Sequence, residues 1–248
     1  GTLPVIVKFF VSRKGAVGGD VGRLYAVNTF GAVVGTVAAG FFLILFLGVK
    51  EAAYLAGAVN LLVAAVVYGL SRVAAPVAEV EADAAPQPAQ EPLLSPGHAR
   101  LALWAVGLSG LCALALEVLW TRSLVYYLDN STHAFTTMLT AFLLGIGLGS
   151  ALIARFIDGR KSPLALFGAI EVLIGVSALL AIPILAHSTP VMSHMIEARL
   201  GPMLHWRWAG LRFVTSLSVM LGPTVLMGMT VPPVVKVYTR SLHRPGPS

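Results

Sequence analysis

The chain has 248 residues, of which 57% are hydrophobic and only 11% are charged. Soluble domains carry roughly a quarter charged residues, so this composition excludes a water-soluble globular fold. The formal charge of +6 does not indicate nucleic-acid binding, because the basic residues are scattered at the ends of apolar runs. The single cysteine, Cys112, excludes a disulfide framework and a cysteine metal cluster.

Six apolar runs are each long enough to form a helix that crosses about 30 Å of hydrocarbon. In chain order they cover residues 24–49, 52–75, 101–127, 132–156, 164–187 and 209–235. The sequence therefore predicts an all-α fold, a polytopic bundle of about six transmembrane helices. Only a few residues around Gly48 separate the first two runs, which predicts a tight helical hairpin.

The predicted spans fall into two groups on either side of a linker. Residues 1–75 would hold the end of a first repeat unit with the two-helix hairpin, and residues 99–248 a four-helix unit. Between them, residues 76–98 are rich in Pro, Ala and acidic side chains, which is typical of a flexible linker. Within the second group, residues 188–207 are too polar to span and predict an amphipathic outer loop.

The distribution of basic residues predicts the orientation of the bundle. Six crossings place 12 of the 17 Lys and Arg residues on the side that holds both chain ends. Because the cytoplasmic side of membrane proteins is enriched in Lys and Arg, we expect both termini to be cytoplasmic.

Two short segments at opposite ends of the chain are similar to each other. Residues Thr2 to Lys8 and Thr230 to Lys236 each begin with Thr-x-Pro, continue with apolar residues and end in lysine. This pattern predicts an internal repeat, which is common in transporter-like folds, although chance similarity of short apolar strings is the alternative.

Four motifs in consistent order carry a family resemblance. They lie in the segments 22–35, 109–122, 141–150 and 227–232. Together they resemble the membrane half of bacterial spermidine-synthase-like proteins, a major-facilitator-like region fused to an aminopropyltransferase domain. The resemblance implies a multi-pass protein of the bacterial inner membrane.

The synthase domain that the resemblance implies is not among these residues. The nearest glycine-rich segment, residues 15–22, is followed by a membrane span instead of a soluble helix, and the next acidic residue after it is Glu51. A dinucleotide-type loop needs an acidic residue about 20 positions on, after a buried strand. We therefore expect a flexible turn there, with no catalytic residues, no cofactor and no metal in this chain.

Two glutamates lie inside predicted spans, where an unpaired charge is costly. Glu117 and Glu171 are candidates for substrate binding, and Arg122 lies close enough to Glu117 in sequence to pair with it or to face the same polar cavity. The alternative role of Glu117 and Arg122 is a structural ion pair, and that of Glu171 is a protonated, hydrogen-bonded core carboxyl. Tyr25 and Asn28 lie at the mouth of the first span, where Asn28 would bond a neighbouring helix or line a substrate entrance.

Small residues predict helix-packing faces in two spans. Gly145 and Gly149 form one such face, and Gly31 and Gly35 form the other. The prolines 223, 232 and 233 predict a break in the last span, which would serve either substrate binding or packing. The loop 158–161 is similar to a degenerate acid-and-arginine loop of major facilitator transporters, but we interpret it as a positive-inside loop.

Three functions remain open at this stage. The first is a non-catalytic membrane module that anchors a synthase or moves a polyamine-like cation, with the lipid bilayer as its environment. The second is an accessory transmembrane subunit that packs against other membrane proteins. An enzyme with its active site inside the bundle has the least support, because two acids and one arginine are all that the spans offer.

Overall fold

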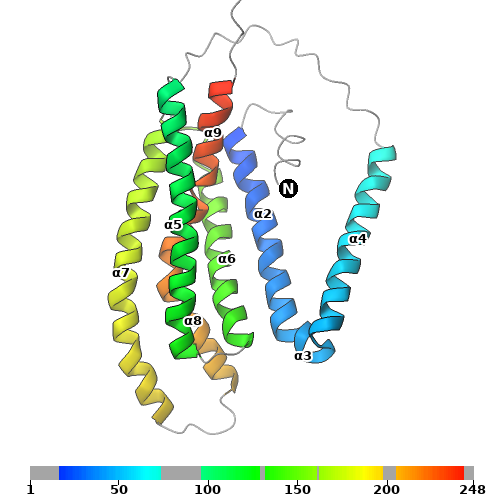
Figure 1. The fold of residues 1–248 in the computed structure, drawn as a ribbon, viewed down its shortest axis with the longest axis vertical. Coiled ribbons are helices and arrows are strands. Elements are labelled where there is room, and N and C mark those ends of the chain that lie inside the picture. The colour runs from blue at the N-terminus through cyan, green and yellow to red at the C-terminus, as the bar shows by residue number, and fades with distance from the viewer. Residues whose placement is uncertain (1–16, 74–95, 129–131, 161, 198–204, 243–248) are drawn as a thin grey trace, which may run out of the picture. The chain divides into compact units, whose positions relative to one another are not determined.

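All regular structure in the described residues is helical. The computed structural model describes residues 17–73, 96–128, 132–160, 162–197 and 205–242. Its elements (Figure 1) are α2 (Val17–Val37), the π-helix η1 (Ala38–Leu43), α3 (Ile44–Leu47), α4 (Val49–Val73), α5 (Pro96–Leu128), α6 (Thr132–Ala154), α7 (Pro163–Glu197), α8 (His205–Gly228) and α9 (Val231–Leu242).

Six segments of these helices are long and apolar enough to cross a membrane. They are Gly18–Leu47, Val49–Arg72, Arg100–Leu124, Thr132–Ala154, Pro163–Ile184 and Leu217–Val237. The predicted all-α fold with six spans is thereby confirmed, and we treat the chain as a multi-pass membrane protein.

The helices form two compact units, whose composition differs from the predicted one. One unit holds α2 and α5 to α9, and the other holds η1, α3 and α4. The sequence groups the first span with the second, in residues 1–75, whereas α2 packs against α6 and α9. Its small residues explain this, since a Cβ at Gly22 would lie 2.8 Å from the Cβ of Ala154. Of the predicted linker, residues 76–95 lie outside the described residues and 96–98 begin α5.

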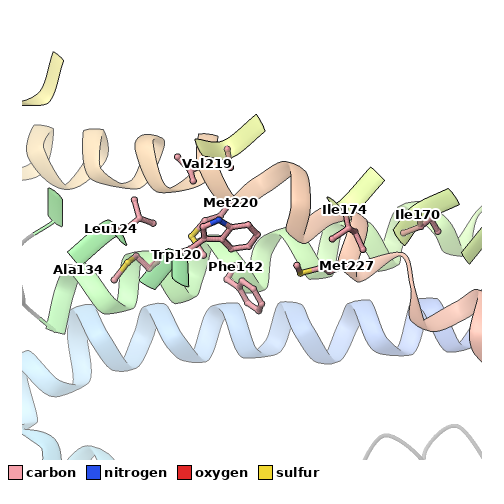
Figure 2. Close-up of a cluster of buried hydrophobic side chains, with 11 residues drawn as sticks. Trp120, Leu124, Ala134, Phe142, Ile170, Ile174, Val219, Met220 and Met227 are labelled. Carbon is pink, nitrogen blue, oxygen red and sulfur yellow. The ribbon is translucent and has the colours of Figure 1, made fainter. Parts of the chain in front are cut away.

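The core of the first unit is an apolar cluster between four helices. It takes Trp120 and Leu124 from α5, Met138 and Phe142 from α6, and further residues from α7 and α8 (Figure 2). The full set is Trp120, Leu124, Ala134, Met138, Phe142, Ile170, Ile174, Ala181, Val219, Met220 and Met227. The core residues of α5 and of α6 are four positions apart, as expected for helices that bury one stripe.

The closest helix contact joins α6 and α8 through glycine. A Cβ at Gly145 would come within 3.0 Å of the Thr224 side chain, and one at Gly149 within 3.0 Å of the Val225 backbone. The buried Ser150 hydroxyl donates a 2.8 Å hydrogen bond to the carbonyl oxygen of Gly228. The two backbones therefore touch, and a hydroxyl ties them together where lipid offers no hydrogen-bond partner.

The second unit turns at Gly48, between α3 and α4. Gly48 has φ of +90°, a conformation that favours glycine. Its N–H donates to the carbonyl oxygen of Ile44 and its own carbonyl accepts from Ala52, both at 3.1 Å. The chain thus ends one helix and begins the next without leaving these backbone groups unpaired.

Two predicted irregular regions are more helical than expected. The prediction of an outer loop over residues 188–207 is wrong at both ends. Helix α7 continues to Glu197 and α8 begins at His205, while residues 198–204 lie outside the described residues. Hydropathy identifies residues suited to hydrocarbon, and a helix can continue past them into the interface. The last span breaks at residues 229–230, whereas Pro223 lies inside α8 and Pro232 in the first turn of α9, where a missing N–H costs nothing.

The α6–α8 contact predicts opposite effects for the same substitution at two glycines. Gly149→Ala should destabilise the protein by about 1–3 kcal/mol, because the added methyl group overlaps the Val225 backbone. Gly31→Ala should be neutral or stabilise by about 0.4–1 kcal/mol, because nothing lies within 4 Å of its Cβ position. The midpoint of thermal unfolding in mild detergent, followed by tryptophan fluorescence, measures both. Equal midpoints for the two variants would contradict the contact.

Candidate functional site

The structure pairs one intramembrane glutamate with a serine on a neighbouring helix. The Ser109 hydroxyl of α5 donates a 2.6 Å hydrogen bond to Oε1 of Glu171 in α7. Both side chains are half-buried. Glu171 lies eight residues after Pro163 in a span of 22 residues, so the pair is well inside the predicted hydrocarbon region.

The stripes that build the core also position this pair. On α5, Ser109 lies four residues before Ala113, in line with the core residues Trp120 and Leu124. On α7, Glu171 follows the buried Ile170 and precedes Ile174 by three residues. Each polar side chain therefore lies at the edge of an apolar stripe, where α5 and α7 run side by side (Figure 1).

Glu117 and Arg122 occupy different environments on α5. Glu117 is half-buried one residue after Leu116, which packs against the core, whereas Arg122 is exposed. Within the part of the chain that the structure describes, the one ion pair within 4.0 Å joins Arg23 to Asp20. The pairing of Glu117 with Arg122 considered from the sequence is therefore not formed.

The polar residues at the mouth of the first span lie away from the glutamates. Tyr25 is half-buried and Asn28 is exposed on α2, which packs against α6 and α9. Their buried neighbour Thr29 donates a 2.8 Å hydrogen bond to the carbonyl oxygen of Tyr25. The structure thus brings Glu171 together with Ser109, and does not bring Tyr25 or Asn28 to that pair.

The predicted helix-packing glycines differ from each other. Gly145 and Gly149 contact α8 directly, as described above. Gly31 and Gly35 are exposed on α2, and nothing lies within 4 Å of the Cβ position of either residue. No helix of the described chain approaches these two closely.

A second polar cluster lies at the end of the first unit where α2 begins and α6 ends. The backbone N–H of Gly19 donates to the Asp158 carboxylate, at 3.1 Å to Oδ2 and 3.3 Å to Oδ1. This N–H is one of the first four of α2, which have no partner inside the helix, and the carboxylate also opposes the positive end of the helix dipole. Asp158 therefore caps α2 from 139 residues away in sequence.

Lys236 of α9 completes this cluster, and we call Gly19, Asp158 and Lys236 the end junction. The buried lysine Nζ donates to the carbonyl oxygens of Ile157 at 2.6 Å, Asp158 at 2.8 Å and Arg160 at 3.4 Å. These carbonyls lie in the turn after α6, where no helix would pair them. The end junction thus fixes this turn, which follows α6, against the start of α2 and against α9.

Sequence reasoning missed the end junction and misinterpreted the segment 15–22. That segment was expected to be a flexible turn, but Val17 to Gly22 form the first turns of α2. Glycine is needed there because a Cβ at Gly19 would clash with the Asp158 carboxylate. The sequence offers one signal for Lys236, since this lysine ends the segment Thr230 to Lys236 that is similar to Thr2 to Lys8. The predicted repeat stays a prediction, because Thr2 to Lys8 lies outside the described residues.

No family model, no curated protein and no solved structure matches the chain. Among the described residues, no group of three or more His, Cys, Asp and Glu side chains is arranged to hold a metal ion. The site and fold together define a helical multi-pass membrane protein with polar side chains at two levels of its bundle.

Lys236→Met should destabilise the protein by about 1–3 kcal/mol, because carbonyl groups in the turn lose a buried donor. The same variant should speed cleavage by trypsin at Arg155 and Arg160 in detergent solution, since the turn is released. Arg160→Gln is the matched control for stability, because it removes an exposed side chain and keeps the carbonyl that Lys236 binds. A Lys236→Met protein with the unfolding midpoint of the control would contradict the role of the end junction.

Proposed function

We propose that this chain is a non-catalytic integral membrane module of a spermidine-synthase-like protein that handles a polyamine-like cation within the membrane. The observation that carries the proposal is the hydrogen bond between Ser109 and Glu171 inside the predicted spans. A carboxyl group at this depth is costly, and such residues are retained mainly for binding, transport or proton movement.

The partner of Glu171 supports a cationic ligand. A serine hydroxyl supplies one hydrogen bond and no positive charge, so the carboxyl group keeps its capacity to bind an ammonium group. Glu117 lies eight residues beyond Ser109 on α5, about 12 Å along the helix axis. A linear polyamine carries several ammonium groups, and it would engage the two carboxyl groups in turn.

The module would be oriented with both chain ends in the cytoplasm of a bacterium, in its inner membrane. This orientation follows from the 12 of 17 basic residues on one side and would leave a synthase domain on that side, anchored by the same spans. Anchoring and cation handling are compatible functions. Measurements on the reconstituted protein distinguish between them.

Exposed glycines favour a second candidate function, that of a structural subunit in a membrane complex. Gly31 and Gly35 form a small-residue face on α2 with nothing within 4 Å of their Cβ positions. In lipid, such faces allow another helix to approach closely. A helix of another membrane protein would fit this face.

Glu171→Gln should weaken spermidine binding by about tenfold or more, because it removes the charge and keeps the size of the side chain. Ser109→Ala should weaken it far less, since it removes a neutral hydrogen bond. Calorimetric titration of the detergent-solubilised protein with spermidine measures the affinity, and flux into proteoliposomes tests transport. Arg122→Gln is the control for a charge change on α5, and it should leave binding unchanged.

The proposal fails in its cation-handling form if wild-type protein does not bind spermidine, or if Glu171→Gln binds it as wild type does. Binding without flux would support anchoring with ligand recognition. A purified protein that stays associated with other membrane proteins in mild detergent, and dissociates when Gly31 and Gly35 are replaced by leucine, would favour the subunit function.

A further inference from the structure

Two exposed arginines flank the turn that the end junction fixes. Arg155 follows the last residue of α6, and Arg160 follows five positions later. Between them, the N–H of Arg160 donates to the carbonyl oxygen of Ile157 at 3.1 Å, and Lys236 binds carbonyl oxygens of the same turn. The backbone that presents the two guanidinium groups is therefore held in place before any ligand binds.

The acidic side chains described at this end have other partners. Asp158 accepts from the N–H of Gly19, and Asp20 lies 3.9 Å from Arg23. Across the described residues, Arg155 and Arg160 have no carboxylate within 4.0 Å. Their positive charge is therefore available to an external anion.

Apolar side chains place this turn at the edge of the hydrocarbon. Phe156 is 61% exposed and Leu152 is 41% exposed, four residues apart in sequence. Arg155 lies between them in sequence, at the end of the span Thr132–Ala154. A basic residue at the end of an apolar span is typical of the level of the lipid headgroups.

We propose that Arg155 and Arg160 bind the phosphate headgroup of an anionic phospholipid, with Phe156 and Leu152 against its acyl chain. A guanidinium group binds phosphate through two parallel hydrogen bonds, and the turn carries two such groups beside the apolar side chains that would enter the same leaflet. The end junction holds the turn in the binding conformation. The turn is therefore ordered during folding, and lipid binding loses little conformational entropy.

Relative lipid affinity tests the site directly. The full chain is reconstituted in phosphatidylcholine vesicles that contain either spin-labelled phosphatidylglycerol or spin-labelled phosphatidylcholine, and electron paramagnetic resonance gives the fraction of immobilised label. Wild type should prefer phosphatidylglycerol. Arg155→Gln and Arg160→Gln should each lower this preference on the order of fivefold, the factor expected for one basic residue near an anionic membrane.

Arg23→Gln is the matched control, because it removes one arginine from the same end of the unit that already has Asp20 as a partner. It should change the preference less than twofold. Absence of a preference in wild type, or an equal loss in Arg23→Gln, would overturn the site in favour of a diffuse charge effect. Competition by inorganic phosphate at equal concentration would overturn the lipid assignment.

Discussion

Hydrocarbon offers no hydrogen-bond partner to the polypeptide backbone, and this constraint governs the whole structure. Helices satisfy their backbone groups internally, which is why the apolar segments of the described chain are helical. Polar side chains inside the spans follow the same rule: Thr136 and Thr140 donate to carbonyl oxygens four residues earlier, at 2.8 and 2.7 Å. Ser150 and Gly228 extend the rule to a contact between helices.

The end junction and the pair of Ser109 and Glu171 differ in the groups that they satisfy. The end junction satisfies backbone groups of its own chain, since Asp158 caps α2 and Lys236 binds the turn after α6. The Ser109 and Glu171 pair satisfies no backbone group, and it places a carboxyl group deep within the spans. A group that folding does not require at that depth is the better candidate for a ligand, whereas the end junction is the better candidate for holding neighbouring surface residues in place.

The sequence predicted the spans because hydropathy measures how favourably a segment transfers from water into hydrocarbon. It could not predict which helices meet. The most apolar windows of α5 and α6 have the same mean hydropathy, yet 61% of the α6 window is buried and none of the α5 window is. Lipid and protein core are equally apolar, so packing depends on shape, as at Gly149, and not on hydrophobicity. Glu171 stood out as a charge among apolar residues, but its partner Ser109 could be found only in three dimensions.

The two proposed sites depend on the number and direction of the membrane crossings. Cysteine accessibility in intact proteoliposomes measures these crossings most directly. In a Cys112→Ala background, cysteines are introduced singly at Lys50, Leu114 and Gly159 and treated with a membrane-impermeant maleimide. Six crossings place Lys50 and Gly159 on opposite sides, so only one of them should react from outside, and Leu114 should react only after denaturation. Reaction of both Lys50→Cys and Gly159→Cys from outside in uniformly oriented vesicles, or ready labelling at position 114, would contradict the six-span structure.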